Sequence, residues 1–213
     1  MMFANVVVGA NPDPCPGNTA DMGVHAAADT VEEKCDAHLE RLVEKQVPTP
    51  QPRKGQVLVK VAYSSVNPCN WKGVLTNKES LVSGSDFSGA VVEAVAPCSL
   101  KAGDEVWGMT FGVGGYAEFL VNDCTQTGLK PASMNMQQAA ALPLVAMTGL
   151  MGLRHAGMPW RSSPTVLVLA GSSGTGISGI QLAKAAGAGR VISTCSESNF
   201  DAVRSFGADQ VID

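Results

Sequence analysis

The stretch GSSGTGISG, residues 171–179, offers the clearest chemistry in this sequence, and it directly follows the apolar run VLVLA. Glycines let a backbone approach a ligand closely. A strand that passes through them into a helix directs backbone N–H groups and the positive end of the helix at one point, which stabilises an anionic phosphate. The residues that this interpretation assigns to a nucleotide cofactor are Gly171, Ser172, Ser173, Gly174, Thr175 and Gly176.

The same turn has a second interpretation, a glycine-rich connection that binds nothing. Its spacing is G-x-x-G-x-G-x-x-G rather than the strict G-x-G-x-x-G, because Ser173 occupies the position of the central glycine. No lysine follows, as the phosphate loop of a nucleoside triphosphatase would require. The strand–turn–helix context favours the binding of a dinucleotide.

Cysteine and histidine could bind a metal, but their spacing predicts no metal site. The six cysteines are Cys15, Cys35, Cys69, Cys98, Cys124 and Cys195. No C-x-x-C pair occurs, and the nearest approach to a metal-binding pair, Cys35 and His38, lacks a second pair to complete a tetrahedron. The chain is not a small disulfide-rich domain and has no visible secretory signal, so we expect reduced thiols.

The composition excludes several classes of protein. The 213 residues are 45% hydrophobic and 16% charged, which is typical of a globular chain. A net charge of −4 and a pI near 5.4 argue against nucleic-acid and anionic-membrane partners. No apolar run reaches the roughly 18 residues of a spanning helix, and the N-terminus has no basic region before its apolar stretch. We therefore expect a cytoplasmic protein.

The elements that must position these residues change character along the chain. Residues 1–47 are irregular, with a short apolar strand at 5–8 and an acidic segment at about 31–45. The proline-rich connection VPTPQPRKGQ then leads into β patterns from Gln56. The expected strands lie in QVLVKVAYSSV, GAVVEAVA, GDEVWGM and GGYAEFLVN. Several short strands at this spacing predict a small barrel or sandwich.

A helical pattern begins near Met134, with Ser133 as its expected N-cap, and Pro143 must kink or interrupt it. Strands at 165–169, 190–194 and 210–213 then alternate with helices that end near 186 and 206. This β-α-β-α-β order is typical of a parallel sheet with right-handed crossovers.

Eight motifs in this order resemble the medium-chain dehydrogenase/reductase superfamily, specifically its zinc-free quinone oxidoreductase and enoyl-reductase-like branch. They are PQPRKGQVLVKV, VNPCNWKG, GSDFSGAVVEAV, AGDEVWGM, GGYAEF, AAALPLVAMTGLMGL, AGSSGTGISGIQLAKAAGA and VISTCSESNFDAVRSFGADQVID. The resemblance implies a GroES-like β-barrel catalytic domain over residues 48–150, followed at 151–213 by a partial Rossmann (βαβαβ) parallel sheet. The barrel motifs count against a methyltransferase, whose βαβ turn is also glycine-rich.

The resemblance also implies chemistry without zinc. Zinc-dependent relatives have a cysteine where this chain has Asn67 and a His-Glu pair where it has Ser85 and Asp86, and neither asparagine nor serine replaces a thiolate or imidazole. Cys69, two residues from the ligand position, is expected to be a packed thiol. The implied reaction is hydride transfer from a nicotinamide to a small-molecule quinone or α,β-unsaturated carbonyl compound.

Asn67 and Tyr116 match positions that line the nicotinamide pocket in the family, as potential hydrogen-bond donors. They are the catalytic residues that the resemblance implies. The competing interpretations are a turn asparagine before Pro68 and an ordinary barrel aromatic residue. Lys72 could face substrate or phosphate, although a solvated lysine is the favoured interpretation.

The expected cofactor is NADPH rather than NADH. An NAD enzyme usually has an acid at the end of the second strand, where this chain has Cys195 followed by Ser196. Ser196 and Asn199 could bind a 2′-phosphate, whereas Glu197 argues against it. Thr148 matches a threonine near the cofactor in the family, with helix packing as its rival role.

Chains of this family run considerably further than 213 residues, and two functions therefore remain open. The first is an NADPH-dependent oxidoreductase whose sequence here is incomplete. The second is a catalytically inactive remnant that acts at most as a nucleotide-binding or interaction module. In either case the first strand of the parallel sheet is expected to be an uncovered apolar edge. A homo-oligomer is possible but nothing in the sequence supports it.

Overall fold

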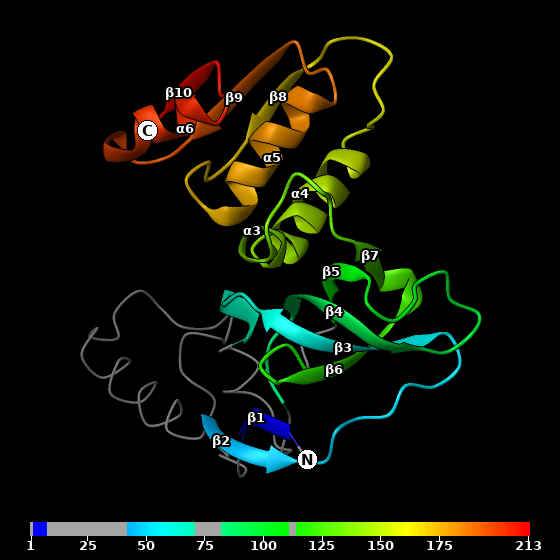
Figure 1. Cartoon of the computed structure of the whole chain (residues 1–213). Coiled ribbons are helices and arrows are strands. Elements are labelled where there is room, and N and C mark those ends of the chain that lie inside the picture. Colours follow the sequence, from blue (N-terminus) through cyan, green and yellow to red (C-terminus); the bar gives the residue numbers. More distant parts are fainter. Residues whose placement is uncertain (1, 8–41, 71–81, 111–113) are drawn as a thin grey trace, which may run out of the picture. The chain divides into compact units, whose positions relative to one another are not determined.

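The computed structural model describes residues 2–7, 42–70, 82–110 and 114–213, which form two compact units. The first unit ends at Ala141 and the second begins at Leu142 (Figure 1). This division falls earlier than the expected boundary after residue 150, because the helix that starts at Pro143 packs within the second unit.

An antiparallel pair of strands lies within the region expected to be irregular. β1 (Met2–Val7) pairs with β2 (Leu42–Val47), with Met2 opposite Val47 and Val7 opposite Leu42. The sequence pattern predicted the first strand at 5–8 and missed β2. The sequence LVEKQV of β2 alternates too weakly between apolar and polar residues to stand out from the acidic segment before it.

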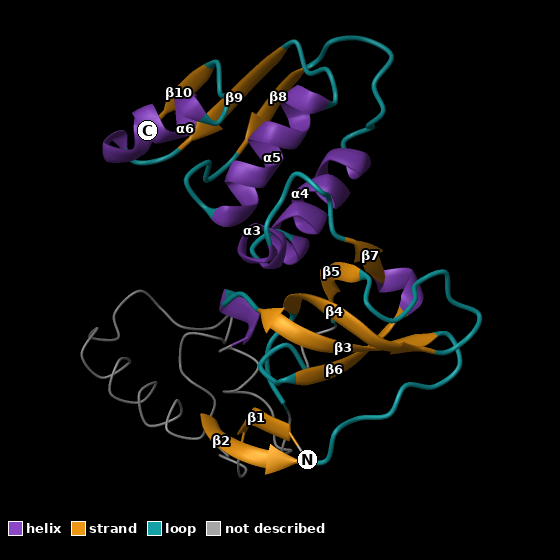
Figure 2. Cartoon of the chain, viewed as in Figure 1, coloured by secondary structure: helices purple, strands orange, loops and turns teal. Residues whose placement is uncertain are grey.

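The rest of the first unit is built on a five-stranded antiparallel sheet with the order β6-β3-β4-β5-β7. Its strands are β3 (Gln56–Tyr63), β4 (Asp86–Ala94), β5 (Glu105–Met109), β6 (Phe119–Asp123) and β7 (Thr127–Leu129). β3 and β4 pair along most of their length, and two register shifts bend the ladder. The expected all-β architecture of this region is confirmed (Figure 2).

One face of this sheet carries the core of the first unit. Val57, Val59, Phe87 and Val106 are completely inaccessible to solvent, and Leu120 is nearly so. They come from four strands and form one apolar cluster. Burying side chains of this size contributes about 1.5–3 kcal/mol each, which fixes the strands that carry the polar residues described below.

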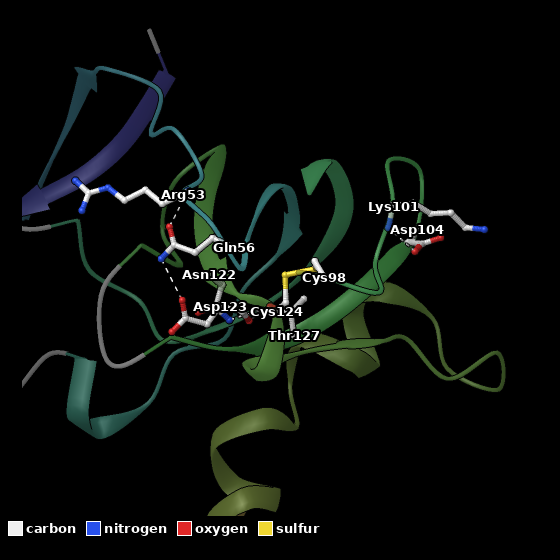
Figure 3. Close-up of a disulfide and its surroundings, with 9 residues drawn as sticks. All are labelled: Arg53, Gln56, Cys98, Lys101, Asp104, Asn122, Asp123, Cys124 and Thr127. Atoms are coloured by element: carbon white, nitrogen blue, oxygen red, sulfur yellow. Dashed lines mark hydrogen bonds between the residues drawn. A yellow bond between two sulfur atoms is a disulfide. The ribbon is translucent and has the colours of Figure 1, made fainter. Parts of the chain in front are cut away.

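A disulfide bond joins Cys98, in the loop after β4, to Cys124, the first residue of the short helix η2 (Cys124–Gln126) (Figure 3). The two Cα atoms are 5.7 Å apart, and both sulfurs pack against the apolar cluster. The expectation that these thiols are reduced is wrong. The pairing depends on the sheet bringing together residues 26 positions apart, which spacing alone did not reveal.

The helical region that follows is interrupted at Pro143, as expected. α3 (Met136–Ala140) ends before it, and Pro143 is the first residue of α4 (Pro143–His155), where its missing N–H leaves no hydrogen bond unmade. The N-cap of α3 is Asn135, not Ser133. Asn135 and Gln138 form a reciprocal capping box, which satisfies two backbone donors where a serine alone would satisfy one.

The second unit contains a three-stranded parallel sheet with the order β10-β9-β8. Its elements are β8 (Thr165–Val168), α5 (Gly174–Ala185), β9 (Arg190–Thr194), η3 (Glu197–Asn199), α6 (Phe200–Ser205) and β10 (Gln210–Ile212). The predicted β-α-β-α-β order is confirmed. Its core includes Ile180, Val191 and Val203, all of which are completely buried.

Two further features of this unit are close packing between two helices and a sheet edge with exposed apolar side chains. A Cβ added to Gly149 of α4 would lie 3.2 Å from the backbone nitrogen of Gly179 in α5, so the two helices touch through glycines. β8 lies at the edge of the described sheet, and the side chains of Leu167 and Leu169 are 57% and 66% exposed. The expected apolar edge is confirmed.

Candidate functional site

The glycine turn between β8 and α5, where the sequence predicts a nucleotide cofactor, has a tightly constrained backbone. Ala170, just after the strand, adopts a φ of 54°, in the left-handed region that costs a residue with a Cβ about 1–2 kcal/mol. The backbone N–H of Ala170 donates to the Thr194 hydroxyl (3.1 Å), and its carbonyl accepts from the backbone and hydroxyl of Ser173. The neighbouring strand thus holds the turn in a strained conformation.

Two of the glycines are required by close contacts. A Cβ on Gly176 would clash with the carbonyl oxygen of Ala170 and lie 2.8 Å from its carbonyl carbon. A Cβ on Gly171 would clash with the Ser193 hydroxyl, which is itself fixed by donation to the Val168 carbonyl. The glycines therefore set the path of the backbone from strand to helix, which any larger residue would displace.

The N-terminus of α5 retains backbone donors. Ser173 is the N-cap, and its hydroxyl accepts from the backbone N–H of Gly176 (3.1 Å). The N–H groups of Gly174 and Thr175 have no acceptor among the described residues. Ser172, Ser173 and Gly174 are exposed. A 12-residue helix with unused donors at an exposed N-terminus is suited to an anionic group.

The residues expected to distinguish NADPH from NADH lie just after the end of β9. Cys195 continues the ladder by donating its backbone N–H to the Ile212 carbonyl, and its side chain packs against the core. Ser196, Glu197 and Asn199 follow, and all three are exposed. The hydroxyl of Ser196 and the side chain of Asn199 form no cap hydrogen bond, so both are available for a ligand.

Thr148, expected near the cofactor, lies on α4 and is exposed. Its hydroxyl donates to the Leu144 carbonyl one turn earlier in the same helix (2.7 Å). The described contact between α4 and α5 is made by its neighbour Gly149, and both roles expected of Thr148 stay predictions.

In the first unit, polar side chains gather around Asp86, the first residue of β4, which is completely buried. Its Oδ2 accepts from the Ser65 hydroxyl and from Nδ2 of Asn67 (2.8 Å). The same Nδ2 also donates to the Ser65 hydroxyl (3.0 Å). Both hydrogens of the Asn67 amide group are therefore used within the protein, and no hydrogen bond to its Oδ1 forms among the described residues.

Asn70 joins the two residues that the sequence assigned to catalysis. Its Oδ1 accepts from the backbone N–H of Asn67 (2.9 Å) and from the hydroxyl of Tyr116 (3.3 Å), while its Nδ2 donates to the Ser85 hydroxyl (2.7 Å). The Tyr116 hydroxyl also donates to the carbonyl of Ser65 (3.1 Å). Asn67 and Tyr116 thus belong to one network, and their hydrogens, expected to point to a ligand, are engaged internally.

The electrostatics of this network act on Tyr116. Burial raises the pKa of its phenol above the usual 10.0, and negative charge at Cys69 and at Asp86 raises the pKa further. The phenol therefore stays protonated at neutral pH. Cys69 itself is exposed, so the expectation of a packed thiol is wrong. Residues 68–70 form a helical turn that directs Asn70 inward and leaves Cys69 outside.

The residues that sequence reasoning missed in this network are Ser65, Asn70 and the role of Asp86. Asn70 follows Asn67 by three positions in NPCN, a spacing that lets a turn close on itself, and this was the available signal. Lys72, and the Cys35–His38 pair, lie outside the described residues. Within the described ranges, no group of three or more histidines, cysteines and acids is placed to hold a metal.

Comparison with known proteins identifies the fold of the first unit. Residues 53–132 match the alcohol dehydrogenase GroES-like domain. The chain is 36% identical over 182 residues to the chloroplast envelope quinone oxidoreductase homolog of Arabidopsis thaliana, a match that covers 79% of this chain and 55% of that protein. The chain belongs to the medium-chain dehydrogenase/reductase superfamily. The resemblance to this superfamily and to its quinone oxidoreductases and enoyl reductases is confirmed, and with it the GroES-like fold and partial Rossmann sheet.

Two further relatives of this superfamily bear on function. A trans-enoyl reductase of Aspergillus flavipes is 33% identical over 195 residues, covering 80% of this chain and 52% of that enzyme. A mycobacterial protein whose structure was solved with NADPH is 28% identical, with a TM-score of 0.74, and the match covers 100% of this chain and 58% of that one. The chain thus spans about half the length of these relatives. Over the described residues, no helix combines the length and apolar character needed to cross a bilayer.

Proposed function

We propose that this chain provides the nucleotide-binding and reaction-site residues of an NADPH-dependent oxidoreductase that reduces quinones or α,β-unsaturated carbonyl compounds. The observation that carries the proposal is the turn at the start of α5, where glycine contacts fix the backbone and the N–H groups of Gly174 and Thr175 have no acceptor among the described residues. The relatives named a quinone oxidoreductase homolog and a trans-enoyl reductase support the substrate class.

A dinucleotide fits the residues of this turn. Its pyrophosphate would accept hydrogen bonds from the backbone N–H groups of Gly174 and Thr175, and the hydroxyls of Ser172 and Thr175 lie in the same segment. NADPH supplies the hydride when bound. The chain itself contributes the fixed turn, the helix N-terminus and, in the first unit, the polar groups of Asn67 and Tyr116.

The preference for NADPH over NADH rests on the end of β9. No carboxylate directly follows the strand, where an acid would bind the ribose hydroxyls of NADH. Ser196 and Asn199 are exposed there and offer hydrogen-bond donors to a 2′-phosphate. Glu197 is exposed nearby and weakens this preference through its charge. The mycobacterial neighbour solved with NADPH supports the same choice.

The residues at the zinc-ligand positions do not fit a zinc ion. Asn67 could offer only its amide oxygen, because its Nδ2 donates to Asp86, and the Ser85 hydroxyl accepts from Asn70. Zinc in catalytic sites is held by thiolate, imidazole and carboxylate, of which only the Asp86 carboxylate is present. We therefore propose a reaction without zinc.

The first experiment is a titration of the 213-residue protein with NADPH and with NADH, followed by cofactor fluorescence. Saturable binding, tighter for NADPH, is the expected result, and assays with quinones and enones follow it. Because the chain spans about half of its relatives, binding and turnover are measured separately. Binding without turnover would favour a nucleotide-binding module over an enzyme.

A matched pair of variants tests the turn. Thr175→Asp places a carboxylate at the second residue of α5, where it favours the helix but repels a phosphate. Gln137→Asp makes the same change at the second residue of α3. We expect Thr175→Asp to weaken NADPH binding about 10-fold or more, equivalent to about 1.4 kcal/mol, and Gln137→Asp to leave it unchanged. Equal affinities for both variants and the wild type would rule out the turn as the phosphate site.

A further inference from the structure

The buried carboxylate of Asp86 determines which way round the amide of Asn67 lies. A carboxylate oxygen only accepts hydrogen bonds, so the group 2.8 Å from it must be the Nδ2 of Asn67 and not its Oδ1. The reverse orientation would bring two oxygens together in a site where Asp86 is completely buried, which is strongly unfavourable. The Ser65 hydroxyl reinforces this orientation, because it donates to Asp86 and accepts from Asn67.

The rest of the network uses up its hydrogens in the same way. The Tyr116 hydroxyl has one hydrogen, which is shared between the carbonyl of Ser65 and Oδ1 of Asn70. Asn67, by contrast, is only 6% exposed, and its Oδ1 receives no hydrogen bond among the described residues. A buried amide oxygen with unused accepting capacity is unfavourable unless a ligand supplies the donor.

We propose that Asp86 is a positioning residue that turns the Oδ1 of Asn67 toward the ligand, so that this site recognises a hydrogen-bond donor. The proposal rests on the NADPH-binding function above and deepens it. The nicotinamide ring of NADPH carries a carboxamide, whose NH2 group is the donor that Asn67 accepts. A carbonyl or quinone oxygen, which only accepts, gains nothing from this oxygen. Asn67 thus orients the nicotinamide and does not stabilise negative charge on the substrate.

The test compares three ligands that differ at the nicotinamide end. NADP+ carries the carboxamide, and its 3-acetylpyridine analogue replaces the NH2 group with a methyl group while keeping the carbonyl. Adenosine 2′,5′-bisphosphate lacks the nicotinamide altogether and reports on binding to the second unit alone. Dissociation constants for all three are measured by calorimetry on the full chain. The affinity for NADP+ divided by that for the analogue measures recognition of the donor.

Three variants locate the source of that preference. Asp86→Asn keeps the size of the side chain but can donate as well as accept, so it no longer fixes the orientation of Asn67. Asn67→Leu removes the acceptor at similar volume. The matched control is Asn122→Leu, which removes another buried asparagine of the same sheet, one that donates to Thr127 and to two backbone carbonyls. It lies outside the Asp86 network.

We expect the wild type to prefer NADP+ over the analogue by about 3- to 10-fold, the range for one hydrogen bond. Asp86→Asn and Asn67→Leu should both reduce this preference by the same factor and leave the bisphosphate affinity unchanged. Asn122→Leu should alter neither, even if it lowers the stability of the sheet. A purely structural role of Asp86 would not change the discrimination between two dinucleotides.

Two results on the wild type keep the proposal open to refutation even if a variant fails to fold. If the wild type binds NADP+ and the analogue equally, the donor recognition proposed for Asn67 is wrong, although NADPH binding stands. If it binds neither the dinucleotides nor the bisphosphate, the proposed function itself fails, and this inference fails with it. An unchanged preference in a folded Asp86→Asn variant would overturn the positioning role alone.

Discussion

The close approach of Gly176 to Ala170 leads to a prediction that two glycine-to-alanine substitutions change the free energy of unfolding in opposite directions. Gly176 is the third residue of α5, and a Cβ there would clash with the carbonyl oxygen of Ala170. The clashing atoms belong to the backbone of a turn that hydrogen bonds to Thr194 already hold. Gly152, in the interior of α4, is exposed and has nothing within 4 Å of an added Cβ.

The magnitudes follow from these two environments. Overpacking costs about 1–3 kcal/mol, and a rigid backbone neighbour places Gly176→Ala toward the upper end of that range. Alanine gains up to about 1 kcal/mol of helix propensity over glycine, which offsets part of this cost. We therefore expect Gly176→Ala to lower the free energy of unfolding of the second unit by about 2 kcal/mol. Gly152→Ala should raise it by about 0.5–1 kcal/mol, since only the propensity gain applies.

Urea unfolding followed by Trp160 fluorescence measures both changes. Trp160 packs against the core of the second unit, and replacing Trp71 and Trp107 with phenylalanine removes the other two tryptophans. For a slope of about 1–3 kcal/mol per molar urea, the two midpoints should differ by about 1–3 M. If Gly176→Ala unfolds at the wild-type midpoint or above it, the turn does not approach Ala170 as described. The reasoning that glycine is required there would then be refuted.

Two further predictions concern the first unit. In a Tyr63→Phe background, Tyr116 is the only tyrosine left, and alkaline titration by ultraviolet absorbance should give a pKa above 10, which Asp86→Asn brings closer to 10. Because the raised pKa belongs to the folded state, its contribution to stability is present below pH 10 and is lost as the pH rises through the folded value. Replacing Cys98 and Cys124 with alanine opens a 26-residue loop and should lower the free energy of unfolding by about 3–4 kcal/mol. A reducing agent should lower the stability of the wild type by the same amount and should leave the double variant unchanged.

The order of elements could be predicted because each element has a local pattern. The parallel sheet of the second unit follows from apolar runs separated by glycine turns and helical periodicity. The interruption at Pro143 follows from the chemistry of proline alone. The missed strand β2 depends on a partner elsewhere in the chain, because it is defined by pairing with β1. The error at the N-cap of α3 is different, since Asn135 and Gln138 are close in sequence and their capping-box spacing was present there to be found.

The two parts of the candidate site differ in how far apart their residues lie in the sequence. The turn from Gly171 to Gly176 is contiguous, so its residues could be found from spacing. The structure explains Gly176 by a contact with nearby Ala170 and Gly171 by a contact with Ser193 of the neighbouring strand. The Asp86 network joins Ser65, Asn70 and Tyr116, which lie up to 51 residues apart. Sequence reasoning assigned a catalytic role to two of its members, Asn67 and Tyr116, through resemblance. It could not find which hydrogens were already engaged, because that depends on how the strands pair.

The chemistry of each part, taken by itself, limits what its ligand must contain. The turn in the second unit offers N–H donors at the positive end of α5, so its ligand must carry an anion that accepts. The network in the first unit offers an oxygen at Asn67, so its ligand must carry a donor. Inorganic phosphate meets the first requirement only, and a quinone, which has no donor, does not meet the second. A nicotinamide dinucleotide meets both, because its pyrophosphate is anionic and its carboxamide carries an NH2 group. Each part, taken by itself, therefore agrees with a nicotinamide dinucleotide, whereas each of the simpler ligands meets the requirement of at most one part.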